Sequence, residues 1–468
     1  MKTKITALLL AVLLLISLTG CTQISGLTKE RAKAIKEDAE ALRVTLEEAF
    51  SLSESPSEML DAVIAFADEN EIYYRTVNDN AVILVKQAPE DTGDDATITM
   101  HCSISPDAAE SSAAKTAAIL TALQDASNHS RTTAVITLRD GLFYTGAMAL
   151  PADYLDTDRL INISDSDSAV LFKNSASLDT HRFSHELSTE PIADYKAYEL
   201  SIDGLSRSTP EQIDEEQTDP VMILYEILNW CEQTHIDYRL SSFKAGDSVE
   251  TLPQSAVMTI SVDSTDVTKF QNKVYEMIQT FKEEHGTSVD SPVFTLRHIE
   301  PLTRAITPED TTDLLGLIYT LLSNFDYLSK NETDTTVGRQ DFSLVDISEA
   351  EMNFTISCRF MDASEEHDDS SAFKELARLN NFNVLDREIY PRWTPDPESM
   401  TAMTFDRCAE EGRLSPKPAS TVDILETGVF AIKKENLSQL AVGISPEDCA
   451  NLTKTLVLFI ETEGQATL

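Results

Sequence analysis

Three short apolar runs lie between residues 96 and 166, and they predict the framework of the first domain. The runs cover residues 96–100, 134–138 and 160–163, and their length and β-branched content are typical of buried strands. Between the first two, residues 108–123 are rich in alanine and leucine, with apolar positions at helical spacing. Strands that alternate with a helix of this length predict an α/β fold with a mostly parallel central sheet.

A polar cluster follows each apolar run. These clusters are His101-Cys102-Ser103, Arg139-Asp140-Gly141 and Ser164-Asp165-Ser166. In open α/β sheets, ligands and reacting groups lie at the carboxyl ends of the strands. We therefore expect an active or binding site at this edge of the sheet. Because side chains alternate along a strand, Asp165 is expected on the face opposite to Ser164.

The pattern after residue 195 predicts a second, inserted domain. It reads strand, helix, strand, strand, helix, strand over residues 197–202, 221–233, 237–243, 257–262, 267–283 and 293–298. This order is typical of a ferredoxin-like α+β sandwich. A proline-rich stretch marks the return to the first domain, and the sequence offers no convincing short internal repeat. The predicted first domain therefore comprises residues 29–192 and 385–468, and the inserted domain residues 193–384.

The N-terminus predicts export and lipidation. Two lysines precede an apolar run from residue 5 to residue 18, which is the layout of a bacterial export signal. The run ends in Leu-Thr-Gly-Cys, which resembles the lipobox of bacterial lipoproteins, where the signal is cut before the cysteine. Residues 1–20 are thus expected to be a signal peptide, and residues 21–28 a linker. The mature protein is expected outside the cytoplasm, anchored to a bacterial membrane through lipid on Cys21 and lacking a transmembrane helix.

Charge and cysteine content exclude several classes of function. The formal net charge is −42 and the pI is about 4.4. Such acidity argues against nucleic acid and against anionic lipid headgroups as partners, because both require lysine and arginine. Besides Cys21 the chain has five widely spaced cysteines without a Cys-x-x-Cys pair. We expect them to be buried as small hydrophobic side chains.

Several motifs occur in the order and spacing of one enzyme family. Residues 97–103 resemble a strand that ends in Gly-His-x-Asp, residues 137–151 a Thr-x-x-Glu-Glu-Thr-Gly segment, and residues 160–165 Leu-Ile-Asn-Leu-Asp-Ser. Residues 390–397 resemble Tyr-Pro-x-Trp-x-Pro-Asn-Pro, and residues 425–430 resemble Leu-Glu-Cys-Gly-Ile-Phe. Together they resemble the aminoacyl-histidine dipeptidases, the peptidase D branch of the two-zinc aminopeptidase and carboxypeptidase superfamily. The resemblance covers nearly the whole mature chain, and implies a zinc-peptidase-like domain with an inserted lid domain.

The resemblance also implies five zinc ligands, most of which this chain has replaced. His101 retains the first histidine, and Glu110 stands in place of the bridging aspartate. The other three ligand positions fall on Gly141, Ser164 and Ile444. None of these three is an ordinary zinc ligand. One ligand is therefore unchanged, one is conservatively replaced, and three are lost.

Residues that assist such a metal site are replaced as well. The general base falls on Asp140, which is one methylene shorter than the family's glutamate. The aspartate that orients the first histidine falls on Ser103, and the lid histidine that polarises the scissile carbonyl falls on Thr209. The Arg-Asn pair that holds the substrate becomes Val249-Glu250, so a cation is exchanged for an anion. Loss at both the metal site and the substrate clamp argues against a mere change of metal.

These replacements favour a lipid-anchored pseudoenzyme that keeps the dipeptidase-like fold and binds a peptide or a protein partner without catalysis. No cofactor is expected, and a homodimer formed through the lid remains open. One alternative is a metal-dependent dipeptidase or aminopeptidase with a rearranged site, which would use zinc on His101 and Glu110 with Asp140 as its base. Another alternative is a solute-binding lipoprotein that serves a transporter. Fold alone does not decide between these functions.

Overall fold

The structure is a computed structural model, and the chain forms two compact units. Unit 1 comprises residues 1–174, 393–420 and 425–468, and unit 2 comprises residues 175–392 and 421–424. The described residues are 26–53, 55–89, 97–127, 129–139, 144–205, 218–249, 251–289, 291–322, 326–328, 336–348, 350–361, 370–396 and 399–465. Within these ranges, no helix is long and apolar enough to cross a membrane. The predicted signal and Cys21 lie outside them.

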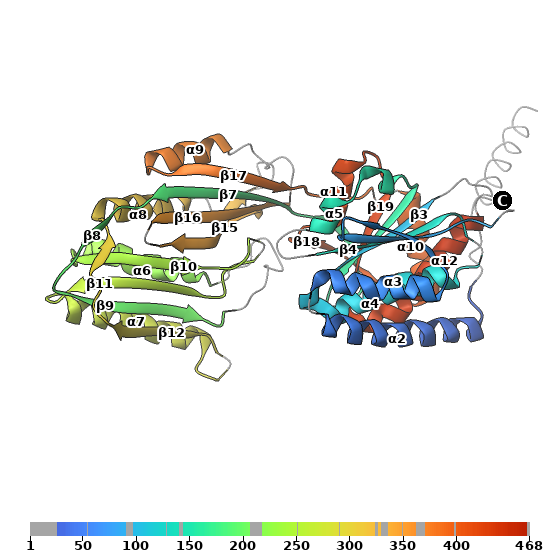
Figure 1. Cartoon of the computed structure of the whole chain (residues 1–468), viewed down its shortest axis with the longest axis horizontal. Helices are drawn as coiled ribbons and strands as arrows, with labels where there is room; N and C mark the ends of the chain where they lie inside the picture. Colours follow the sequence, from blue (N-terminus) through green and yellow to red (C-terminus); the bar gives the residue numbers. More distant parts are fainter. Residues whose placement is uncertain are drawn as a thin grey trace, which may run out of the picture. The chain divides into compact units, whose positions relative to one another are not determined.

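Unit 1 is built on an eight-stranded sheet (Figure 1). In spatial order its strands are β1 (Tyr73–Val77), β2 (Ala81–Lys86), β4 (Thr132–Leu138), β3 (Ile98–Ile104), β5 (Arg159–Asp165), β19 (Gln439–Ile444), β6 (Val170–Ser175) and β18 (Lys417–Thr421). The four central strands β4, β3, β5 and β19 run parallel. Their outer neighbours β2 and β6 run antiparallel to them. The predicted α/β fold with a mostly parallel sheet is thus confirmed.

Helices cover both faces of this sheet. They are α2 (Lys29–Leu52), α3 (Pro56–Glu69), α4 (Ala109–Asp125), α5 (Thr145–Ala149), α10 (Met400–Gly412), α11 (Glu426–Lys433) and α12 (Cys449–Gln465). Strand β3 shows which helix covers which face, because its side chains alternate. Cys102 contacts Thr116 of α4, whereas the ring of His101 packs edge-on against Phe430 of α11. The alanine-rich stretch of α4 is fully buried, and its small side chains let the helix pack closely on the sheet.

Unit 2 contains the predicted ferredoxin-like sandwich. Its elements are β9 (Tyr195–Asp203), α6 (Pro220–Gln233), β10 (Tyr238–Ala245), β11 (Ala256–Asp263), α7 (Val267–His285) and β12 (Val293–Ile299). The four strands are antiparallel in the spatial order β12-β9-β11-β10. Apolar side chains of both helices, such as Leu224 and Phe270, are buried against this half of the sheet. The βαββαβ reading of this segment is therefore confirmed.

A second half of unit 2 repeats the same order of elements. It consists of β7 (Ser177–Glu186), α8 (Pro308–Leu322), β15 (Thr336–Ile347), β16 (Glu351–Phe360), α9 (Ser370–Leu379) and β17 (Asn383–Tyr390). These strands continue the sheet in the order β10-β15-β16-β7-β17, and β10 pairs with β15 antiparallel. We did not predict this repeat from the sequence, because the whole first sandwich is inserted between β7 and α8.

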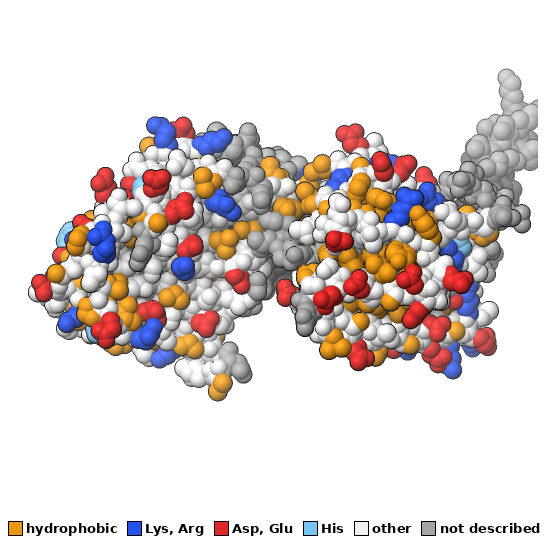
Figure 2. Space-filling model, in the orientation of Figure 1, with side chains coloured by type: hydrophobic (Ala, Val, Ile, Leu, Met, Phe, Trp, Pro, Cys, Tyr) orange, Lys and Arg blue, Asp and Glu red, His pale blue; other side chains and the backbone are white. Residues whose placement is uncertain are grey.

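The observed division into units differs from the predicted domain boundaries. From the sequence we predicted that residues 175–192 belong to the first part of the first domain and residues 385–392 to its second part. Strand β7, however, pairs along its length with β16 and with β17, so these residues belong to unit 2. Two short strands, β8 (Thr189–Pro191) and β13 (Arg304–Ile306), pair with each other separately. In Figure 2 acidic side chains are scattered over the visible face rather than gathered in one patch, as expected for a solvated acidic surface.

Candidate functional site

The parallel register brings the predicted site residues to one edge of the unit 1 sheet. His101 on β3 lies opposite Asn162 on β5. On the other side of β5, Ser164 lies opposite Gly443 and Asp165 lies opposite Ile444. Because these strands are parallel, their polar carboxyl ends meet, as the sequence predicted. Glu110 follows β3 along the chain and is exposed in the first turn of α4.

His101 is fully buried, and both of its ring nitrogens have hydrogen-bond partners. Nδ1 lies 2.6 Å from Oδ1 of Asn162, and Nε2 lies 3.0 Å from the hydroxyl of Thr137. Burial lowers the pKa of His101, so the ring is neutral at pH 7. The amide nitrogen of Asn162 donates elsewhere, so its oxygen accepts the proton from Nδ1. Nε2 is then the acceptor for the Thr137 hydroxyl, and no ring nitrogen is left for a metal.

Glu426 joins this histidine to the replaced ligand positions. It is the first residue of α11 and is only 1% exposed. Its carboxylate accepts hydrogen bonds from the Ser103 hydroxyl at 2.6 Å and from the Asn162 amide at 3.0 Å. The same amide lies 3.1 Å from the Ser164 hydroxyl. The start of a helix stabilises a carboxylate, so Glu426 suits this position. We call these six residues the His101 network: His101, Ser103, Thr137, Asn162, Ser164 and Glu426.

The opposite face of the same strands carries a buried cation. Lys115 of α4 is almost fully buried, and its Nζ lies 2.7 Å from a carboxylate oxygen of Asp165. Burial alone raises the pKa of Asp165, but Lys115 and the Ser111 hydroxyl outweigh it, and the pKa is lowered overall. The prediction that Asp165 points away from Ser164 is therefore confirmed. Asp165 is occupied by Lys115 and does not replace the lost ligand at Ser164.

The side chains at this edge do not fit a two-zinc site. His101 spends both nitrogens on neighbours, and the Ser164 hydroxyl is engaged by Asn162. Ile444 is apolar and buried. The Glu426 carboxylate is directed at Ser103 and Asn162. A zinc ion needs about four donors within about 2.0–2.3 Å, and the described donors here already bind one another.

Four positions of the predicted metal site and substrate clamp lie outside the described residues. They are Asp140 and Gly141, which follow β4, and Thr209 and Glu250, which lie in the inserted domain. Val249 is described and buried, and its carbonyl accepts a hydrogen bond from Ser357. Its neighbour Glu250 is not among the described residues. The roles expected for these positions thus remain predictions.

Sequence reasoning missed the residues that organise the site. Asn162 and Lys115 are polar residues inside runs that read as a buried strand and a buried helix, and a buried polar group requires a partner. Glu426 opens an apolar helix in the same way. These polar residues inside apolar runs were therefore the signal available in the sequence. The signal does not identify their partners, because Asn162 and Glu426 are 264 positions apart.

The cysteines behave as predicted. All five that lie within the described part of the chain are buried, and none of them is in a disulfide there. Burial raises the pKa of Cys102, Cys231, Cys408 and Cys449 to about 12 in each case. A thiol with so high a pKa is neither a nucleophile nor a ready metal ligand at neutral pH. These cysteines are small hydrophobic side chains of the two cores.

A hollow of about 400 Å³ lies elsewhere on unit 1. Its walls include Trp393, Lys434 and Gln439, the first residue of β19. It is thus at the amino end of that strand, whereas the predicted site is at the carboxyl end. Trp393 itself packs with Phe172 and Leu425 in a small apolar cluster, in line with the packing role favoured for it from the sequence.

Comparisons with known proteins bear on this fold. Among solved structures, aminoacylhistidine dipeptidase from Vibrio alginolyticus matches over 94% of this chain and 98% of its own, with a TM-score of 0.62 and 16% identity. A tripeptidase from Staphylococcus aureus matches over 92% and 99%, with a TM-score of 0.50 and 10% identity. The chain has the fold of these peptidases. No protein-family model and no curated sequence matches it.

The peptidase fold thus agrees with the resemblance drawn from the motifs. The match spans almost the full length of both chains, so unit 2 belongs to the shared architecture. At 16% identity the likeness concerns the fold, and the activity must be argued from the side chains. Those side chains form the His101 network in place of a set of free metal ligands.

Proposed function

We propose that this protein is an extracytoplasmic lipoprotein that binds peptides without cleaving them. The observation that carries the proposal is the state of His101, whose two ring nitrogens are both hydrogen-bonded in a fully buried network. A metal ligand must present a free nitrogen lone pair. The one histidine ligand retained from the family pattern therefore serves the fold instead of a metal.

Peptide is the preferred ligand class because the chain keeps the peptidase fold over its full length. Catalysis and binding use different groups in such enzymes, so the loss of metal ligands alone does not remove a peptide-binding surface. The replaced clamp at Val249-Glu250 argues for a ligand without the free carboxylate that the family's Arg-Asn pair would hold. An internal peptide segment or a capped peptide end meets that requirement better than a free dipeptide.

The lipid anchor is proposed from the sequence at Cys21 and its preceding apolar run. A full-length chain expressed in a bacterium should partition into the detergent phase of a Triton X-114 separation, because the diacylated thiol adds two apolar chains. Cys21→Ala removes the thiol that would carry the lipid, so this variant should lack the lipid whether or not its signal peptide is cleaved. Equal partition of a signal-cleaved Cys21→Ala variant would overturn the lipoprotein assignment.

The non-catalytic role is tested on the soluble form that begins at Thr22. The protein would be incubated with zinc, desalted, and assayed for hydrolysis of Xaa-His dipeptides and tripeptides, with His101→Gln as the comparison. We expect no turnover above a boiled control in either protein, and equal zinc content in both. Zinc-dependent turnover that His101→Gln abolishes would overturn the proposal and favour the rearranged metallopeptidase.

Binding is tested on the same protein by isothermal titration. Acetylated and amidated peptides should bind, while free dipeptides, amino acids and sugars should bind at least tenfold more weakly. Tight binding of a small solute with no binding of capped peptides would instead favour the solute-binding lipoprotein. The lid-mediated homodimer stays a separate prediction. The edge of β10 is taken by β15 within the chain, so a dimer that extends the described sheet of unit 2 would have to use β12 or β17.

A further inference from the structure

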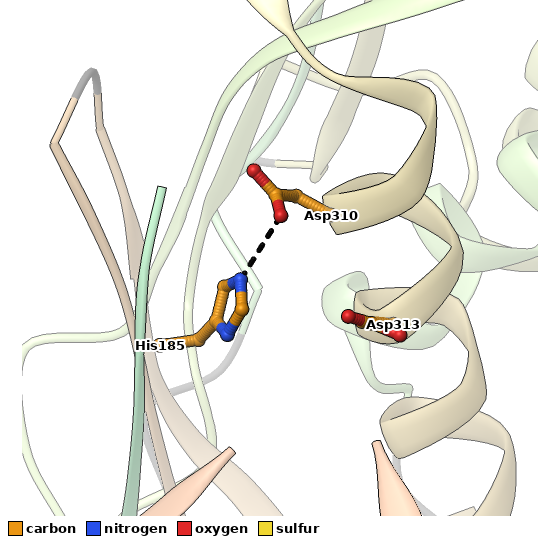
Figure 3. Close-up of side chains that lie close together, drawn as sticks. All are labelled: His185, Asp310 and Asp313. Carbon is orange, nitrogen blue, oxygen red and sulfur yellow. Dashed lines mark hydrogen bonds and ion pairs between the residues drawn. The ribbon is translucent and has the colours of Figure 1, made fainter. Parts of the chain in front are cut away.

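A second cluster of metal-binding side chains lies in unit 2, apart from the His101 network. It consists of His185 near the end of β7 and of Asp310 and Asp313 in the first turns of α8 (Figure 3). Each offers one ligand atom, and the three atoms lie within 4.8 Å of one another. Figure 3 shows Asp310 reaching from α8 to His185, with Asp313 further along the same helix. Neither sequence motif nor family resemblance pointed to this cluster.

The histidine is oriented as metal-binding histidines are. Its Nδ1 lies 2.8 Å from the backbone carbonyl of Asn381, and its Nε2 lies 3.1 Å from Oδ1 of Asp310. Both of these partners are acceptors, so a proton lies between Nε2 and Asp310. A metal ion would take the place of that proton, while Nδ1–H stays on the backbone carbonyl and orients the ring. In tetrahedral zinc sites, bonds of about 2.0–2.1 Å place neighbouring ligand atoms about 3.3 Å apart. The observed separation of Nε2 and Oδ1 is close to that value.

The two aspartates are also held in place by groups outside the cluster. Asp310 is 7% exposed and accepts a hydrogen bond from the Ser188 backbone N–H at 2.6 Å. Asp313 accepts one from the Asn381 side chain at 2.8 Å. Asn381 therefore orients both His185 and Asp313, and its backbone is in the left-handed region, with φ of 58°. Such supporting hydrogen bonds are typical of the groups that orient metal ligands.

Among the described residues, neither Asp310 nor Asp313 forms an ion pair with a lysine or an arginine, and Asp310 pairs with His185. A buried carboxylate beside a second one is costly unless a cation compensates it.

We propose that His185, Asp310 and Asp313 form a zinc site that fastens α8 to β7 in the second half of unit 2. One imidazole and two carboxylates suit zinc, with water as the fourth ligand, whereas magnesium and calcium prefer oxygen ligands alone. The site goes beyond the proposed function, because it lies in the other unit and uses none of the His101 network.

The test is zinc content, measured by mass spectrometry on the whole soluble chain after zinc incubation and desalting. The wild-type protein should retain close to one zinc per chain. Asp313→Asn keeps the acceptor for Asn381, and His185→Gln keeps a donor for Asp310, so both should fold while their zinc affinity falls about 10–100-fold. His298→Gln on β12 and His101→Gln are the matched controls and should retain zinc like the wild type.

A second readout follows the thermal midpoint of unit 2 through Trp230 in a Trp393→Phe background. Zinc should raise this midpoint in the wild-type protein and not in Asp313→Asn, while magnesium and calcium should leave both unchanged. No retained zinc, or equal zinc in His185→Gln and in the wild type, would overturn the lid site and leave the proposed function standing. Zinc that is lost in His101→Gln but kept in His185→Gln would overturn both.

Discussion

The His101 network makes a sharp prediction for Asn162, whose side chain is fully buried and bonds three other members. Replacement by leucine, which has a similar volume, keeps the packing and removes the amide. The Nδ1–H of His101 then has no acceptor, and Glu426 loses one of its two donors. An unsatisfied buried donor costs about 1–3 kcal/mol, and a hydrogen bond to a charged group contributes about 1.5–3 kcal/mol. Together they predict a loss of about 3–5 kcal/mol.

The chain offers a clean assay for this loss, because it has two tryptophans, one in each unit. Trp393 lies in unit 1 and is buried, whereas Trp230 lies on α6 of unit 2. In a Trp230→Phe background, fluorescence during urea unfolding reports unit 1 alone. The unfolding free energies of Asn162→Leu and of the parent are then compared in that background. A domain has about 5–15 kcal/mol of stability, so a loss of this size is easily measured.

The control is Asn451→Leu, the same change at a partly exposed position of α12 in the same unit. It should alter the unfolding free energy by less than about 0.5 kcal/mol. A loss below about 1 kcal/mol in Asn162→Leu would refute the reasoning. So would equal losses in the two variants. In either case the His101 network would not be what holds this edge of the sheet together.

Three further predictions use the same background or its Trp393→Phe counterpart. Lys115→Met breaks the ion pair with Asp165, whose side chain is 42% exposed and partly hydrated. The unfolding free energy of unit 1 should therefore fall by about 2–3 kcal/mol. The double variant Lys115→Met/Asp165→Asn should recover most of this loss, and no recovery would contradict the pairing. Burial raises the pKa of Asp219, the N-cap of α6, to about 7. The folded chain therefore keeps a proton that the unfolded chain releases at about pH 4, and the unfolding free energy falls as the pH rises from about 4 to about 7. Asp219→Asn keeps the capping acceptor without titrating. In thermal melts this variant should be more stable than the parent at pH 8 and equally stable at pH 4, and a difference that does not change with pH would contradict the raised pKa. Gly246 directly follows β10 and has φ of 74°, and an added Cβ there would lie 1.9 Å from the Ser343 carbonyl oxygen. Gly246→Ala should therefore cost unit 2 at least about 3 kcal/mol, and a loss under about 1 kcal/mol would show that the two halves can shift apart.

The elements predicted best were those whose signal is local. The runs that became β3, β4 and β5 are almost entirely buried on both faces, as expected of strands covered by helices on either side. The first ferredoxin-like half was predicted because its six elements follow one another without interruption. The second half was missed for the opposite reason. Its first strand, β7, is separated from its other five elements by the whole first half, so no continuous window of sequence contains the pattern.

The candidate site was likewise predicted in part and missed in part. Its location at the carboxyl edge of the sheet followed from topology, and the replaced ligand positions followed from the family motifs. The partners that now occupy His101 did not, since Thr137, Asn162 and Glu426 come from β4, β5 and α11. A motif states which residue stands at a ligand position. It does not state whether another side chain has taken that residue as a hydrogen-bond partner.

Retention of His101 is the residue-level fact that most invites assignment of this chain as an active peptidase. In an enzyme with this pattern, the orienting aspartate two residues later leaves the other ring nitrogen to the metal. Here Ser103 cannot orient the ring, and its hydroxyl turns to Glu426 instead. Asn162 binds Nδ1 in its stead, and Thr137 binds Nε2. A buried histidine that loses its metal must find such partners or be replaced, because an unpaired ring nitrogen in the core is costly. In the function proposed above, His101 and the residue at another predicted ligand position, Ser164, therefore belong to one hydrogen-bonded arrangement, and the histidine alone does not argue for catalysis.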